Sequence, residues 1–124
     1  MSRRSVLFVL FVLSIFFAAC GSPAAAPTTG AAGEHVDGSK AKKLVAGGAR
    51  LIDVRGADEY GAKHIDGAEN APVETIEDRD MGPKDAALVL YCSSGARSSR
   101  AATTLRSRGY TRVYELGGMS NWDK

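Results

Sequence analysis

The stretch Cys92-Ser93-Ser94-Gly95-Ala96-Arg97-Ser98 decides how this chain folds, because it separates an apolar run from an amphipathic one. The apolar run, Ala86 to Tyr91, predicts a buried strand that ends at the cysteine, and Ser98 to Arg108 predicts a helix that Gly109 stops. A cysteine on such a turn lies where backbone N–H groups converge at the positive end of a helix. These donors favour the thiolate, which is the nucleophilic form of cysteine.

Around this turn, short predicted strands alternate with predicted helices. The extended segments are Leu51 to Val54, Gly67 to Pro72 and Arg112 to Leu116, and the helices are Lys40 to Ala46 and Asp58 to Gly61. Strands separated by helices imply crossover connections and therefore an α/β fold with a small, mostly parallel sheet flanked by helices. In such sheets the functional site lies beyond the carboxyl ends of the strands, which is where the sequence places Cys92.

The N-terminal segment has the organisation of an export signal. Arg3 and Arg4 precede an apolar run from Val6 to Phe17, and Ala18-Ala19-Cys20 follows. The apolar run is shorter than the roughly 20 residues that a membrane-spanning helix needs. We therefore expect residues 1–19 to be a signal peptide, exported by the general route or by the twin-arginine route, of which the apolar run favours the general one.

This segment also resembles a bacterial lipoprotein signal, in which the cysteine after the small residues is lipidated. The resemblance implies a lipid on Cys20 that anchors the chain on the periplasmic side of a membrane. Gly21 follows the cysteine in place of aspartate, which leans toward the outer membrane. A simple cleaved signal is the alternative, because Phe17 stands where that family usually has leucine.

The next segment, Gly21 to Gly33, has no hydrophobic period and is rich in alanine, proline and glycine. We expect residues 20–33 to form the lipidated cysteine and a flexible tether, and residues 34–124 to form one small domain. The chain has two cysteines, so Cys92 has no disulfide partner if Cys20 carries lipid. A lone thiol in an oxidising compartment favours a functional cysteine over a buried inert one.

The charge balance narrows the class of ligand. Removing residues 1–19 takes away Arg3 and Arg4 and no acid, so the 16 Lys and Arg fall to 14, equal to the 14 Asp and Glu. This balance gives no support for nucleic-acid binding. Basic residues outnumber acidic ones from Leu88 onward, and a positive field around Cys92 favours a small anionic substrate.

Several motifs resemble the rhodanese family, in the order in which that family carries them. They are Leu51-Ile52-Asp53-Val54-Arg55, Glu59-Tyr60, His64-Ile65-Asp66-Gly67-Ala68, Asn70, Pro72, the cysteine loop, Gly109-Tyr110, Val113-Tyr114, Leu116-Gly117-Gly118 and Trp122. The resemblance covers residues 35–123 and implies a rhodanese-like fold and sulfurtransferase activity. Ser93 is a departure, since many active members carry a basic or amide side chain after the cysteine.

The resemblance also implies a role for each residue of the loop. Cys92 would attack the sulfane sulfur of a donor such as thiosulfate, become a persulfide and pass the sulfur to cyanide or a thiol. Arg97 would bind the oxyanionic donor. The persulfide would be held by backbone N–H groups of the loop, those of Ser93, Ser94, Gly95, Ala96, Arg97 and Ser98. The Ser94 hydroxyl is either a further donor to the sulfur or a surface group of the turn.

The residues around the loop have supporting roles in this prediction. Asp53 and Arg55 are expected to brace the loop through an ion pair, and His64 to fix a turn more readily than to act as an acid or base. No second histidine or cysteine lies near Cys92 in the sequence, so we expect neither a metal nor a cofactor.

Two other functions are compatible with a cysteine loop. Protein tyrosine phosphatases have a loop with one more residue between cysteine and arginine, whereas four residues, Ser93 to Ala96, intervene here. The smaller ring suits one sulfur atom better than a phosphate group. The other alternative is a membrane-tethered module that carries sulfur or docks a protein without turnover, which Ser93 keeps open.

Overall fold

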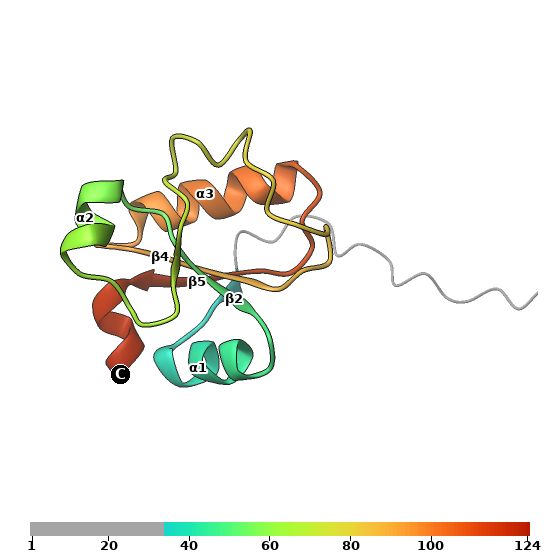
Figure 1. Cartoon of the computed structure of the whole chain (residues 1–124). Coiled ribbons are helices and arrows are strands. Elements are labelled where there is room, and N and C mark those ends of the chain that lie inside the picture. Colours follow the sequence, from blue (N-terminus) through green and yellow to red (C-terminus); the bar gives the residue numbers. More distant parts are fainter. Residues whose placement is uncertain (1–33) are drawn as a thin grey trace, which may run out of the picture.

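Five parallel strands in the order β1-β5-β4-β2-β3 form the sheet of the computed structural model, which describes residues 34–124 (Figure 1). The strands are β1 (Glu34–His35), β2 (Arg50–Asp53), β3 (Glu69–Asn70), β4 (Leu88–Cys92) and β5 (Val113–Gly118). The helices are α1 (Gly38–Ala46), α2 (Ala57–Ala62), α3 (Ala96–Ser107) and the 3₁₀ helix η1 (Met119–Asp123). The predicted signal peptide, Cys20 and the tether lie outside the described residues.

Strand β4 shows why helices cover both faces of this sheet. All five of its residues are buried, and successive side chains of a strand point to opposite faces. Leu88, Leu90 and Cys92 belong to the apolar cluster under α3, and Val89 and Tyr91 belong to the cluster under α1 and η1. Figure 1 shows α3 on one side of the sheet and α1 on the other. A continuous apolar run is therefore what this central strand requires.

The α/β fold class with a parallel sheet is confirmed, and the differences from the sequence-based elements lie at their ends. Helix α3 begins two residues earlier than predicted, at Ala96, because Gly95 adopts the positive φ at the turn and leaves Ala96 and Arg97 free to be helical. Strand β4 includes Cys92, which the prediction placed just after the strand. Among residues 34–124, no helix is long and apolar enough to span a bilayer.

Strand β1 is the one strand that the prediction omitted. Its two residues have exposed side chains, so they carry no apolar pattern, and they join the sheet by pairing with Tyr114 and Glu115 of β5. Val36, the residue after β1, is buried and donates its N–H to the carbonyl oxygen of Glu115 at 3.0 Å. The sheet therefore starts at the first described residue.

Candidate active site

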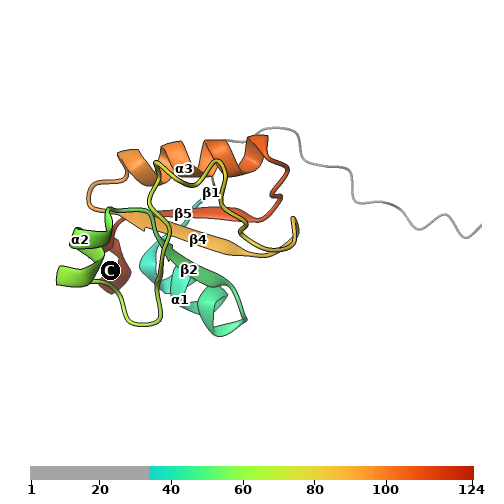
Figure 2. The same cartoon turned by 45° about the horizontal axis from the view of Figure 1, so that its top comes forward.

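Cys92 is the last residue of β4, between β2 and β5, at the carboxyl edge of the sheet. The chain turns there through Ser93, Ser94 and Gly95 and enters α3 at Ala96. Figure 2 shows α2 beside this turn, and a bond between their side chains, described below, ties the two together. Carboxyl ends of parallel strands are where α/β proteins place their ligands.

The turn wraps backbone donors around the sulfur. Gly95 has φ 106°, a left-handed conformation that side chains rarely adopt, and its N–H donates to the Sγ atom of Cys92 at 2.9 Å. The Cys92 Sγ and Ser98 Oγ atoms are 3.7 Å apart, and the Ser98 hydroxyl donates to the Gly95 carbonyl oxygen at 2.9 Å. This hydroxyl can turn its hydrogen toward the sulfur once the sulfur is a thiolate.

The pKa of the Cys92 thiol is lowered by these contacts. Burial, the largest single influence, raises the pKa, because it disfavours the charged thiolate. Hydrogen bonds to the sulfur outweigh it, from the backbone and hydroxyl of Ser98 and from the backbones of Gly95 and Ser94. Cys92 is fully buried and is a free cysteine. The site therefore holds a shielded thiol that ionises more readily than an ordinary one.

Two glycines of β5 let the strand pass close to the cysteine loop. The register of β5 against β4 shifts after Leu90, at a β-bulge, and Gly117 has a positive φ of 81°. A Cβ atom on Gly118 would lie 2.9 Å from the Ser93 carbonyl oxygen, and one on Gly95 would lie 3.6 Å from the Cα of Gly117. A side chain at position 118 would therefore clash with the loop, whereas the contact at Gly95 is an ordinary one and that glycine is required by its positive φ.

Arg97 points to α2 and forms a bidentate ion pair there. Its Nη1 and Nη2 atoms donate to the carboxylate of Glu59 at 2.6 and 2.9 Å, and Nη2 also donates to the Ser93 hydroxyl at 3.1 Å. The bonds from Arg97, and after them the N–H of Gly56, lower the pKa of Glu59 to about 2. Arg97 is thus already bound to an anion, a carboxylate of the protein itself.

Asp53 and Arg55 form the ion pair expected of them, at the end of β2. The carboxylate of Asp53 accepts hydrogen bonds from the backbone N–H and the guanidinium of Arg55, with an Nη2–Oδ2 distance of 2.7 Å. Arg55 also donates to the Lys63 carbonyl oxygen, and the Asn70 side chain donates to the carbonyl oxygens of Asp53 and Arg55. These bonds join the end of β2 to the segment after α2 and to β3.

His64 lies outside this network. Its Nδ1 atom is 2.8 Å from the Tyr60 carbonyl oxygen, and its ring stacks on that of Tyr60 with centroids 3.9 Å apart. Both contacts tie His64 back to α2, and the expected role in fixing the turn that follows it stays a prediction. Within residues 34–124, no three His, Cys, Asp or Glu side chains gather as metal ligands.

The structure therefore divides the predicted site residues into two groups. Ser94, Gly95 and Ser98 surround the sulfur of Cys92 with donors, whereas Ser93 and Arg97 make their side-chain contacts with Glu59. Ala96 starts α3 and its side chain is exposed.

Three further residues that shape the site received no role in it from the sequence. Glu59, Gly117 and Gly118 entered only as family motifs. No local signal in the sequence pairs Glu59 with Arg97, because the two residues are 38 positions apart and meet only in the folded domain.

The fold and the site define an α/β protein with a buried thiol of lowered pKa, held by N–H donors at a strand-to-helix turn. The chain belongs to the rhodanese-like domain family, which matches residues 37–124.

Individual relatives agree with that assignment. The uncharacterized protein YqhL of Bacillus subtilis is 43% identical over 76 residues, which cover 60% of each chain. Thiosulfate sulfurtransferase PspE of Escherichia coli is 33% identical over 73 residues, 56% of this chain and 70% of that protein. The solved structure of the human single-domain sulfurtransferase TSTD1 superposes with a TM-score of 0.64 at 30% identity, covering 75% of this chain and 96% of that one.

Proposed function

We propose that this chain is a sulfurtransferase that passes a sulfane sulfur from a thiosulfate-type donor to cyanide or a thiol through a persulfide on Cys92. The observation that carries this proposal is the sulfur of Cys92, whose pKa is lowered by the donors of Ser94, Gly95 and Ser98. A similarity to a protein named thiosulfate sulfurtransferase supports the donor class.

The reaction has two steps. The Cys92 thiolate attacks the outer sulfur of thiosulfate, a sulfur–sulfur bond forms, and the bond inside thiosulfate breaks so that sulfite leaves with the electron pair. The resulting persulfide carries one negative charge on its terminal sulfur. Cyanide then attacks that terminal sulfur, thiocyanate leaves, and the Cys92 thiolate is restored.

The loop is suited to the charge in this sequence of steps. The persulfide keeps a negative sulfur at the site, and fixed N–H donors stabilise such a charge without rearranging. The bond from the Gly95 N–H to the sulfur, at 2.9 Å, is one such donor in place before reaction. The same donors that favour the thiolate therefore serve the intermediate.

Binding of the donor involves an exchange at Arg97. The guanidinium holds the Glu59 carboxylate in a two-bond geometry, and the sulfonate end of thiosulfate offers oxygens in a similar arrangement. Thiosulfate would displace Glu59 from Arg97 as it enters. In this proposal Glu59 preserves the orientation of Arg97 between turnovers and competes with the substrate.

The test is intact mass spectrometry of the full chain after treatment with thiosulfate. Wild-type protein should gain the mass of one sulfur atom and lose it on addition of cyanide, with release of thiocyanate. Cys92→Ser should gain nothing while it stays folded, because a hydroxyl is a poor nucleophile toward sulfur. A folded Cys92→Ser variant that turns over normally would overturn the proposal. A persulfide that cyanide does not remove would favour the sulfur-carrier alternative.

For location, we propose a lipoprotein anchored through Cys20 on the periplasmic side, in the outer membrane. The support is the sequence of the N-terminal segment, from Arg3 to Gly21. Wild-type protein should incorporate a labelled fatty acid and partition into detergent, and Cys20→Ala should not incorporate the label. Unlabelled, fully soluble wild-type protein in the native host would refute the anchor and leave the sulfur chemistry untouched.

A further inference from the structure

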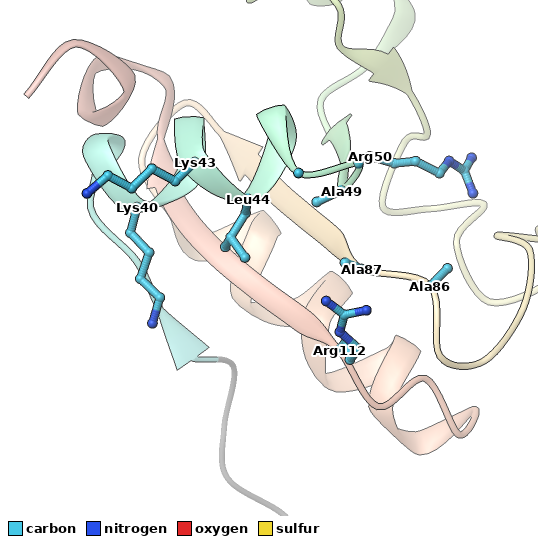
Figure 3. A pocket seen from close by; sticks show the side chains of 10 residues that line it. Lys40, Lys43, Leu44, Ala49, Arg50, Ala86, Ala87 and Arg112 are labelled. Atoms are coloured by element: carbon cyan, nitrogen blue, oxygen red, sulfur yellow. The ribbon is translucent and has the colours of Figure 1, made fainter.

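The edge of the sheet opposite Cys92 carries an open hollow of about 550 Å³. It lies between the end of α1, the Gly47-Gly48 turn and the amino ends of β2, β4 and β5, as Figure 3 shows. Leu44, Ala49, Ala86 and Ala87 line its floor. Four basic side chains and no acidic one complete the lining, namely Lys40, Lys43, Arg50 and Arg112.

Two of the four basic residues are already engaged by the protein. Arg50 donates to both carboxylate oxygens of Glu69, at 2.7 and 2.9 Å, and to a backbone carbonyl oxygen. Lys40 forms an ion pair with Glu34. Among residues 34–124, no hydrogen bond or ion pair engages the side chains of Lys43 and Arg112, and both are exposed. These two cations are available to an external anion.

The cations surround the hollow and do not converge on one point. Figure 3 shows Arg112 on one side of Leu44 and Lys43 on the other. A single small anion needs several donors aimed at the same atom. Basic side chains that are spread around an apolar floor are complementary to a surface of many anionic headgroups that lie over an apolar layer.

The course of the chain points to the same surface. Glu34, the first described residue, pairs with Tyr114 near the start of β5, two residues after Arg112. The chain therefore enters the domain at the amino edge of the sheet, which is the edge that carries the hollow. Cys92 lies at the other edge, at the carboxyl end of β4.

Nearby acids do not occupy the hollow. Glu34 and Glu69 are held in ion pairs by Lys40 and Arg50. Asp85 is exposed and adjoins the hollow through Ala86, but its side chain is not part of the lining.

We propose that this edge docks on an anionic phospholipid surface through Lys43 and Arg112, which leaves the edge with Cys92 facing the aqueous phase. The inference goes beyond the sulfurtransferase proposal and does not depend on the lipid at Cys20, because the charges belong to the folded domain. Attraction of basic residues to anionic headgroups strengthens membrane association by about fivefold per residue.

The experiment labels lysines of the full chain held in bilayer discs of phosphatidylcholine, with or without phosphatidylglycerol. An amine-acetylating reagent and mass spectrometry report how accessible each lysine is. Acetylation of Lys43 should fall severalfold in the anionic discs, because attraction to the headgroups covers this side chain. Lys42 is exposed on the same helix beside Trp122, and Lys63 follows α2 near the opposite edge, so acetylation of both should be unchanged.

A charge reversal tests the second cation. Arg112→Glu should restore most of the acetylation of Lys43 in anionic discs, whereas Arg100→Glu, an exposed position on α3 outside the hollow, should not. Equal labelling of Lys43 in both discs, or equal protection of Lys42, would overturn the proposal. Protection of Lys43 by inorganic phosphate alone, without a bilayer, would also overturn it in favour of a small-anion site.

Discussion

The two ion pairs at the carboxyl edge differ in burial, and that difference separates their roles. The side chains of Asp53 and Arg55 are 0% and 8% exposed, whereas those of Glu59 and Arg97 are 41% and 35% exposed. A buried pair cannot open without leaving a charge in apolar surroundings. A half-exposed pair can exchange its partner for water or for another anion at little cost. The first pair is therefore expected to stay closed, whereas the second pair can open.

The separation along the chain reinforces this contrast. Asp53 ends β2 and Arg55 follows it by two residues, so this contact is local in the sequence. Glu59 and Arg97 are 38 residues apart and join α2 to α3. The donors that ring the sulfur come from the loop and α3, and not from either ion pair. Changes in the exposed pair should therefore affect binding more than the shape of the loop.

The largest effect should come from breaking the buried pair. Arg55→Met leaves the fully buried carboxylate of Asp53 without its charged partner, and removal of one member of a buried pair costs about 3–5 kcal/mol of unfolding free energy. Asp53→Asn combined with Arg55→Met should recover part of that loss, because no buried charge remains. Urea unfolding of the full chain measures both variants. A cost below about 1 kcal/mol for Arg55→Met would place this pair with surface ion pairs.

Burial also explains which strands the sequence could predict. The strands β2, β4 and β5 carry apolar residues that are buried, so their pattern was visible, as was the turn that ends in α3. Strand β1 has two exposed residues and joins the sheet only through backbone pairing with β5, which leaves no mark on side-chain pattern.

Contacts at the site were likewise predictable only where both partners are close in the sequence. The Asp53–Arg55 pair could be expected because both residues lie at one strand end. The partner of Arg97 could not, since the contact with Glu59 depends on how α2 is placed against the cysteine loop. The fit of Gly118 against Ser93 likewise depends on the bulge in β5. Local chemistry was predictable, and distant partners required the fold.

The second prediction opens the exposed pair. Glu59→Gln removes the charge that competes with the donor for Arg97, so the KM for thiosulfate should fall severalfold while the cyanide step changes little. Thermal stability should change little, because the pair is half exposed. Steady-state kinetics against thiosulfate and against cyanide separate the two steps. Glu77→Gln, an exposed acid outside this network, is the matched control. A raised KM would show that Glu59 orients Arg97 for the donor more than it competes.

The smallest effect should come from Ser98, which belongs to neither pair and acts on the sulfur directly. Its backbone and hydroxyl help to lower the pKa of Cys92 against the opposing effect of burial, so the thiolate reacts at a lower pH than an ordinary thiol. Ser98→Ala removes the hydroxyl and keeps the backbone donor, so the pKa should rise and the midpoint of alkylation against pH should move upward. The rate of iodoacetamide labelling across pH measures this midpoint. Ser99→Ala, an exposed serine on the same turn of α3, should leave it in place. An unmoved midpoint in Ser98→Ala would assign the lowered pKa to backbone donors alone, and the hydroxyl would then serve only the Gly95 carbonyl.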